Sequence, residues 1–245
     1  MAVPLLEAEG LTKRYGGLVA NNAVSMTMEP GEVRGLIGPN GAGKTTFVNL
    51  LTGLETPDAG RVRLDGADLT GLPLNRIAAQ GLVRTFQVAR VFANLSVREN
   101  LLVPFLAAGS PGGVREGLAR AAELLAVATL QPLADEPAGV LSGGQRMLLQ
   151  ACAGFMIPAV RLYVLDEPFA GINPVLKDTL IGLIQRENTD KGRAFLVVSH
   201  EMEIVRRLCP RVTVMIQGRV AAEGTLDEVA RLPEVITAYL GRVAA

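Results

Sequence analysis

The chain has 245 residues, with 24 basic and 24 acidic side chains that give a formal net charge of zero. Its 49% hydrophobic and 20% charged residues exclude a mainly disordered chain, and the zero net charge offers no electrostatic attraction for nucleic acid as a partner. The mean hydropathy of +0.31 is high. The most apolar stretches, residues 101–108 and 151–160, are nevertheless far shorter than the roughly 20 residues of a membrane-spanning helix. We therefore expect a chain that does not itself cross a membrane, with its apolar residues in a core, a partner surface, or both.

The N-terminal stretch MAVPLLEAEG lacks the basic start, the long apolar run and the small-residue cleavage site of a signal peptide. The cysteines, Cys152 and Cys209, lie far apart in the sequence and predict neither a disulfide framework nor a metal knuckle. The single histidine, His200, leaves too few soft ligands for a zinc site. These features predict a cytosolic chain with reduced thiols.

Short β-like runs alternate along the chain with segments that carry helix signals, which predicts an α/β fold. Three runs are apolar throughout, as expected of central parallel strands that are covered on both faces. These three are residues 33–37, 162–165 and 195–198. The full set of β-like runs, in chain order, is residues 33–37, 61–65, 161–165, 194–199 and 211–216.

Between residues 88 and 140 the strand signal disappears, and alanine-leucine helical patterns replace it. Ser96 and Glu99 form a capping-box pair that predicts a helix start in this segment. Thr225 and Glu228 form a second such pair near the C-terminus. We interpret residues 88–140 as a helical insertion into the α/β core; the alternative is that these helices simply cover the sheet.

The strongest motif is Gly38-Pro39-Asn40-Gly41-Ala42-Gly43-Lys44-Thr45, which matches the phosphate-loop pattern GxxxxGK[ST]. It follows an apolar strand and precedes a predicted helix at residues 46–51, as the motif requires. Its glycines let successive backbone N–H groups converge on phosphate oxygens, and the helix N-terminus adds a partial positive charge. We expect Lys44 to reach the β- and γ-phosphates, Thr45 to ligate Mg²⁺, and Thr46 to hydrogen-bond the α-phosphate.

The second motif is the apolar run of residues 161–165 that ends in two adjacent carboxylates, Asp166 and Glu167. Alone, this pattern is a common way for a strand to end. Together with a phosphate loop, it predicts that Asp166 lies near Mg²⁺ as a ligand. Glu167 is then placed to act as the general base that polarises an attacking water.

The third motif, Leu141-Ser142-Gly143-Gly144-Gln145, begins a helical run shortly before the second motif. A serine and two glycines at a helix N-terminus make a second anion cradle. One nucleotide does not need two such cradles on one chain. We therefore predict that this cradle serves the nucleotide of another subunit; the alternative is an ordinary N-capped helix.

With these three motifs, the sequence resembles the ATP-binding cassette (ABC) family of transporter ATPases over nearly its whole length. LSGGQ matches the family signature, GPNGAGKT its Walker A motif and LYVLDEP its Walker B motif. The resemblance implies one domain, residues 1–245, with an α/β P-loop NTPase (RecA-like) core, an antiparallel β subdomain and an inserted α-helical subdomain. It assigns residues 1–87 and 155–245 to the core with its β subdomain, and residues 88–154 to the helical subdomain.

The resemblance also implies roles for three further residues. Gln87 matches the glutamine that contacts Mg²⁺ and the hydrolytic water, so the implied Mg²⁺ ligands are Thr45, Gln87 and Asp166. His200 matches the histidine that contacts the γ-phosphate, although a lone histidine is more often structural. Tyr15 matches the aromatic residue that stacks on adenine, with a core or surface tyrosine as the alternative.

Residues 14–18, 81–87 and 235–241 are similar to the ATPases of branched-chain amino-acid importers. This subgroup implies ATP hydrolysis, with ATP and Mg²⁺ as cofactors, at the cytoplasmic face of the plasma membrane, where the chain is peripheral. The implied partners are a second ABC ATPase, two transmembrane permeases and, indirectly, a periplasmic solute-binding protein. Urea or amide importers and lipid or lipopolysaccharide exporters remain alternatives. A non-transport ABC ATPase is a weaker one, and LSGGQ argues against a P-loop kinase or GTPase.

Asn173 departs from the family, which usually carries aspartate at this D-loop position, where the two ATPase subunits meet. Since asparagine cannot make a charge-assisted contact, we expect a heterodimer rather than a homodimer; a neutral local variant is the alternative. The helix after the signature also lacks the arginines that are usual there. Finally, Val88, Val91, Phe92 and Leu95 are expected to offer an apolar socket to a membrane subunit, unless they are buried in this chain's own core.

Overall fold

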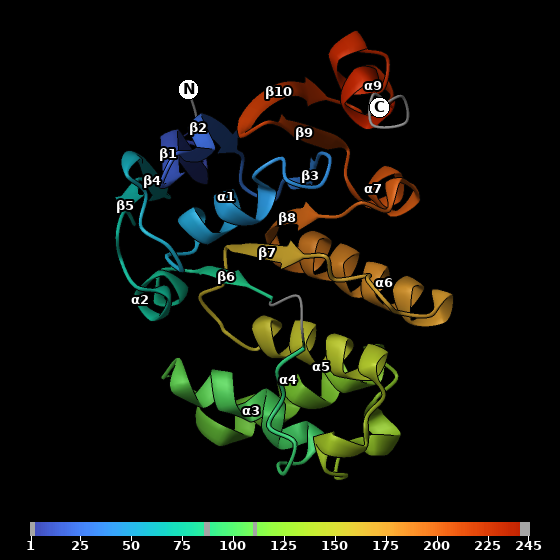
Figure 1. The fold of residues 1–245 in the computed structure, drawn as a ribbon. Helices are drawn as coiled ribbons and strands as arrows, with labels where there is room; N and C mark the ends of the chain where they lie inside the picture. Colours follow the sequence, from blue (N-terminus) through green and yellow to red (C-terminus); the bar gives the residue numbers. More distant parts are fainter. Residues whose placement is uncertain (1–2, 86–88, 110–111, 241–245) are drawn as a thin grey trace.

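The structure is a computed structural model and describes residues 3–85, 89–109 and 112–240. Figure 1 shows an antiparallel sheet at one end, a larger parallel sheet in the middle and a group of helices at the other end. This arrangement confirms the predicted α/β fold with an antiparallel β part and an inserted helical part. The predicted division at residues 88 and 154 stays a prediction.

The central sheet has the strand order β10-β9-β3-β8-β7-β6. All neighbouring strands are parallel except β10, which pairs antiparallel with β9. Every residue of β3, β7 and β8 is buried, so the prediction of three central strands covered on both faces is confirmed. The bounds are β3 Val33–Ile37, β6 Leu82–Arg84, β7 Leu162–Asp166, β8 Ala194–Val198, β9 Arg211–Ile216 and β10 Arg219–Gly224.

The smaller antiparallel sheet has the order β2-β1-β4-β5. The sequence pattern marked only one of its strands, near residues 61–65, because the longer strands do not alternate evenly. In β1 the pairing register shifts between Ala8 and Leu11, so the buried side chains change phase within the strand. The bounds are β1 Leu6–Tyr15, β2 Leu18–Met28, β4 Ala59–Leu64 and β5 Ala67–Asp68.

Alternate residues of the central strands face two separate hydrophobic clusters. Leu36 and Val164 pack with the antiparallel sheet and α1, whereas Ile37 and Leu165 pack on the opposite face with α6 and the helical group. The helices beside the sheets are α1 Lys44–Leu51, α2 Leu74–Ala79, α6 Pro174–Lys191, α7 Met202–Leu208, α8 Leu226–Val229 and α9 Pro233–Leu240. Among the helices of the described ranges, none is long and apolar enough to cross a bilayer.

The helical group contains α3 Val97–Ala107, α4 Gly113–Val127 and α5 Gly143–Phe155, with two short 3-10 helices between α4 and α5. Its first helix begins with the predicted capping box, in which Ser96 Oγ accepts from the Glu99 N–H at 3.1 Å and the Glu99 carboxylate accepts from the Ser96 N–H at 2.7 Å. The Thr225–Glu228 capping box of α8 is confirmed in the same way. Both helix starts therefore follow from local sequence.

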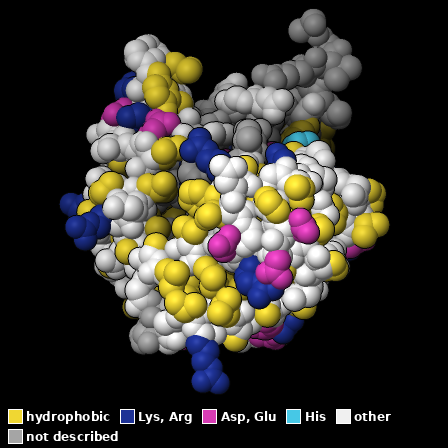
Figure 2. Space-filling model, turned by 90° about the horizontal axis from the view of Figure 1, so that it is seen from below, with side chains coloured by type: hydrophobic (Ala, Val, Ile, Leu, Met, Phe, Trp, Pro, Cys, Tyr) yellow, Lys and Arg dark blue, Asp and Glu magenta, His cyan; other side chains and the backbone are white. Residues whose placement is uncertain are grey.

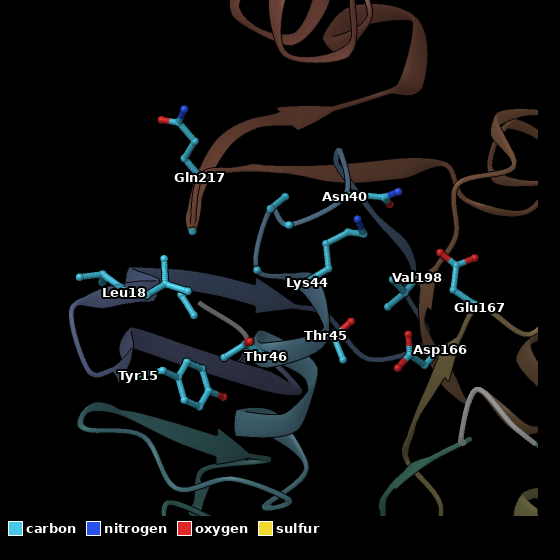
Figure 3. A pocket seen from close by; sticks show the side chains of 16 residues that line it. Tyr15, Leu18, Asn40, Lys44, Thr45, Thr46, Asp166, Glu167, Val198 and Gln217 are labelled. Carbon is cyan, nitrogen blue, oxygen red and sulfur yellow. The ribbon is translucent and has the colours of Figure 1, made fainter. Parts of the chain in front are cut away.

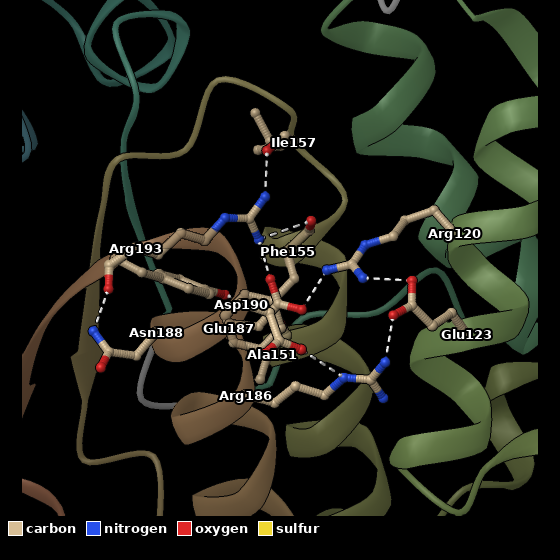
Figure 4. Close-up of polar contacts among 11 residues, drawn as sticks. Arg120, Glu123, Ala151, Phe155, Ile157, Arg186, Glu187, Asn188, Asp190 and Arg193 are labelled. Atoms are coloured by element: carbon tan, nitrogen blue, oxygen red, sulfur yellow. Dashed lines mark hydrogen bonds and ion pairs between the residues drawn. The ribbon is translucent and has the colours of Figure 1, made fainter. Parts of the chain in front are cut away.

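A network of ion pairs joins the helical group to the core (Figure 4). Glu187 of α6, whose side chain is 3% exposed, accepts from Arg193 Nη1 at 2.6 Å and also pairs with Arg120 of α4. Glu123 of α4 pairs with Arg120 at 2.8 Å and with Arg186 of α6 at 2.7 Å. The network therefore fixes α4 against α6 through charged side chains that are partly removed from solvent.

Candidate functional site

A cavity of about 580 Å³ lies between the phosphate loop, the start of β2 and the end of β7. Figure 3 shows Tyr15 and Leu18 at one side of this cavity, with Asp166 and Glu167 at the other. Lys44 lies between them. The remaining lining residues are Val19, Ala20, Asn40, Gly41, Ala42, Gly43, Thr45, Thr46, Val198, Gln217 and Gly218.

The phosphate loop has a backbone shape that requires glycine. Gly41 and Gly43 have φ values of +78° and +95°. A Cβ at Gly43 would lie 2.4 Å from the carbonyl oxygen of Ala20, so the loop approaches β2 too closely for any side chain. Helix α1 starts at Lys44, earlier than predicted, without a side-chain cap or an acidic residue in its first turn. Its first N–H groups therefore face the cavity as donors for an anion, which fits a nucleotide phosphate.

Lys44 points back over the loop that precedes it. Its Nζ donates to the carbonyl oxygens of Gly38, at 2.7 Å, and Pro39, at 3.1 Å. Burial lowers the pKa of Lys44, while the charges of Glu167 and Asp166 oppose that shift. The ammonium group is thus held at the loop by weak carbonyl partners that phosphate oxygens can replace.

Asp166 ends β7 and lies in a well-defined polar environment. Its Oδ2 accepts from Arg84 Nη2 at 3.0 Å, and its backbone N–H donates to Thr85 Oγ1 at 3.0 Å. Burial raises the pKa of Asp166, and the adjacent Arg84 charge opposes this. The sequence analysis missed Arg84; the signal available was a charged residue directly after the apolar pair Leu82 and Val83 of β6.

The cavity fits Mg²⁺ held mainly by phosphate oxygens. Thr45 and Asp166 both line it and offer oxygen ligands, which are those that Mg²⁺ prefers. Within the described residues, no group of three or more His, Cys, Asp or Glu side chains could hold a metal by itself. Gln87, the third predicted ligand, lies outside the described residues.

Glu167 and His200 are brought together at the carboxyl ends of two neighbouring strands. Glu167 Oε2 lies 2.9 Å from His200 Nδ1, and the two side chains are 17% and 68% exposed. Glu167 has a φ of +49°, a left-handed conformation that is uncommon for a residue with a side chain. Such conformations are concentrated at functional sites.

Tyr15 lies at the other end of the cavity and is 44% exposed, so the alternative of a core tyrosine does not hold. Its hydroxyl donates to Glu55, and burial together with this contact raises the pKa of Tyr15. The Nζ of Lys13 lies 5.8 Å from the ring centroid. The ring is therefore oriented by partners of its own and remains accessible to a flat aromatic group such as adenine.

The signature motif, Leu141, Ser142, Gly143, Gly144 and Gln145, starts α5 as predicted. Ser142 Oγ accepts from the Gln145 N–H at 3.3 Å in a capping box. Ser142 and Gln145 line a separate groove of about 430 Å³, together with Asn173. None of the signature residues is among those that line the phosphate-loop cavity. This separation agrees with a cradle for another subunit's nucleotide.

Asn173 has a local role that the sequence analysis did not assign. Its Oδ1 accepts from the Leu176 N–H at 3.0 Å and caps the N-terminus of α6. Asparagine and aspartate are about equally good at this position. The cap supports the alternative of a local variant and leaves the subunit-contact prediction untested.

The predicted apolar socket is only partly available on the surface. Phe92 is 58% exposed, whereas Val91 and Leu95 are half-buried, and Val91 packs against the main core. Val88 lies outside the described residues. Figure 2 views the molecule from the helical side and shows several hydrophobic patches among scattered charges. Apart from Phe92, exposed apolar residues of the helical group include Leu106, Val114, Leu118 and Val140.

Comparison with known proteins gives a consistent set of relatives. Residues 21–170 match the protein family described as ABC transporter. The chain is 41% identical to the high-affinity branched-chain amino acid transport ATP-binding protein BraF of Pseudomonas aeruginosa, over 98% of this chain and 99% of that protein. It is 39% identical to the protein of the same description named LivG from Escherichia coli K12, with the same coverage of both chains. A solved structure of MJ1267, an ATP-binding cassette of an ABC transporter in its ADP conformation, is 32% identical with a TM-score of 0.85, covering 98% of this chain and 100% of that chain.

Proposed function

The chain belongs to the ABC transporter family, and from this premise we propose that it is the ATP-hydrolysing subunit of an importer for branched-chain amino acids. The observation that supports the ATPase activity is that the phosphate loop, Asp166 and Glu167 all line the same cavity. The substrate class is supported by the similarity to BraF and LivG along nearly the whole chain.

We assign a task to each end of the cavity. The loop N–H groups and Lys44 bind the phosphates of ATP, and the exposed ring of Tyr15 stacks on adenine. Thr45 and Asp166, with Gln87, would hold Mg²⁺, which would neutralise negative charge on the phosphates of ATP. The residues with these roles lie in the first turn of α1 and at the ends of β1 and β7.

Hydrolysis requires a water that attacks the γ-phosphorus from the side opposite the leaving ADP. Glu167 accepts the proton of this water as the new P–O bond forms and the bond to the β-phosphate oxygen breaks. His200, at 2.9 Å from Glu167, orients the carboxylate and contacts the γ-phosphate. Glu167 has a left-handed backbone conformation, and its side chain lines the cavity next to Asp166 (Figure 3).

The proposed assembly contains a second ABC ATPase, which closes head-to-tail on this chain. In that arrangement Ser142, Gly143 and Gly144 complete the partner's ATP site, which agrees with their separation from this chain's own cavity. Phe92 and the exposed apolar residues near it contact one of two membrane permeases. The chain then lies on the cytoplasmic face of the membrane, and a periplasmic binding protein delivers the solute to the permeases.

The direct test is transport by the assembled complex. The chain is reconstituted into proteoliposomes with its permeases and second ATPase, and ATP-dependent uptake of labelled leucine, isoleucine and valine is measured against urea and a short amide. We expect uptake of the branched-chain amino acids only, and its loss with Glu167→Gln. Uptake of urea or the amide instead, or lipid movement in the outward direction, would reject the proposed substrate.

A further inference from the structure

A chain of hydrogen-bonded side chains connects the two ends of the cavity beneath helix α1. At the Asp166 end, Arg84 Nη2 donates to Asp166 Oδ2 at 3.0 Å, and Arg84 Nη1 donates to Asn49 Oδ1 at 2.7 Å. Asn49 Nδ2 then donates to Glu55 Oε1 at 2.7 Å, and the other carboxylate oxygen of Glu55 accepts from the Tyr15 hydroxyl. The five residues come from four separate parts of the chain, so the contacts depend on the fold.

Arg84 is the central member of this chain. Its side chain is 5% exposed and faces the Asp166 carboxylate, which is 7% exposed. Arg84 Nη1 also lies 3.2 Å from the Thr52 hydroxyl at the end of α1. The planar guanidinium can make these contacts at fixed angles and at the same time, which a lysine ammonium cannot.

Asn49 anchors the guanidinium to the helix that binds phosphate. It lies on α1, whose first residues, Lys44 and Thr45, line the cavity. Its amide oxygen accepts from Arg84 and its amide nitrogen donates to Glu55, so the Asn49 side chain connects the two residues.

We propose that Arg84 is a positioning residue that holds Asp166 in place for the metal of bound ATP, and that Asn49 and Glu55 link this position to Tyr15 at the adenine end. Arg84 contacts Oδ2 of Asp166, and Asp166 also lines the cavity. The inference rests on the proposed ATPase function. It adds residues outside the phosphate loop, the Walker B strand and the signature motif.

The test measures nucleotide binding rather than turnover. The full chain is titrated with a fluorescent ATP analogue in EDTA and over a series of Mg²⁺ concentrations. With Arg84→Lys we expect the Mg²⁺ concentration needed for half-maximal tightening to rise by about 10- to 100-fold, the usual effect of removing a group that orients a metal ligand. Binding in EDTA should stay close to that of the unmodified chain. Arg76→Lys, an exposed arginine of α2, is the matched control and should change neither value.

Asn49→Ala provides a second variant that should fold, since alanine favours the helix and Asn49 is only half-buried. We expect it to raise the Mg²⁺ requirement and also to weaken binding in EDTA, because it releases both Arg84 and the Glu55–Tyr15 pair. An Arg84→Lys protein with unchanged melting temperature and an unchanged Mg²⁺ requirement would overturn the proposal. If Arg84→Lys does not fold, an unchanged Mg²⁺ requirement in Asn49→Ala would overturn it. Absence of analogue binding by the unmodified chain would instead reject the proposed ATPase function.

Discussion

The Nδ1 atom of His200 lies 2.9 Å from Oε2 of Glu167. The two residues follow the adjacent parallel strands β8 and β7, in which Val198 is paired with Asp166. Strand pairing therefore brings the histidine to the carboxylate, although one side chain is largely exposed and the other is mostly buried.

His200→Ala should slow ATP hydrolysis by up to about 10²-fold, because a misplaced catalytic group costs about that much in rate. Nucleotide binding should persist, since the loop, Lys44 and Asp166 are unchanged. Phosphate release by the assembled complex and binding of a fluorescent ATP analogue measure the two effects separately. A parental hydrolysis rate would show that the contact with Glu167 has no catalytic role.

The sequence predicted the parts of the structure that local patterns determine. The three central strands are apolar because both faces are covered, and each capping box uses residues only three positions apart. The phosphate loop was also predictable, since glycine at Gly41 and Gly43 reflects a backbone shape that other residues resist. Only the start of α1 was placed too late.

Features that depend on distant parts of the chain could not be predicted. Arg84 is the last residue of the edge strand β6, and its contact with Asp166 exists only because β6 pairs with β7. The register shift in β1 hides its alternation. Val91 packs on the core because of the position of the helical group, which the sequence around it does not specify.

Phe92→Glu should uncouple ATP hydrolysis from transport without unfolding the chain. The side chain is 58% exposed, while the backbone is held independently by Asn100, which accepts from the Phe92 N–H at 2.8 Å and donates to its carbonyl oxygen at 3.0 Å. We expect normal ATP binding by the isolated chain and strongly reduced uptake in proteoliposomes. Val3→Glu, also exposed, is the control. Loss of folding with Phe92→Glu, or normal uptake, would contradict the docking role.

Self-association of this chain should be weak, with stable closure only in the presence of a second ATPase. Asn173 caps its own helix and brings no charge to the subunit contact. Sedimentation of Glu167→Gln with ATP, alone and with the second ATPase, distinguishes the cases. A tight homodimer of this chain alone, with full transport supported by it, would contradict the prediction.

Arg193→Met should destabilise the fold by about 1–3 kcal/mol, because it removes the 2.6 Å partner of the buried Glu187 carboxylate, which keeps only its pair with Arg120. Arg186→Met is a suitable control, since Arg186 is 43% exposed and its pairs should contribute less than about 1 kcal/mol. Urea denaturation of the two variants gives the comparison. Equal free energies of unfolding would show that the network at the junction of α4 and α6 contributes little to stability.

The most direct test of the ATPase site is phosphate release by the assembled complex carrying Glu167→Gln. The substitution removes the proposed base and leaves Lys44, Thr45 and Asp166 to bind Mg²⁺ and ATP. We expect ATP to remain bound while phosphate release falls by about 10²- to 10⁴-fold, the usual contribution of a general base. Phosphate release at the parental rate would contradict the role of Glu167 on which the proposed mechanism depends.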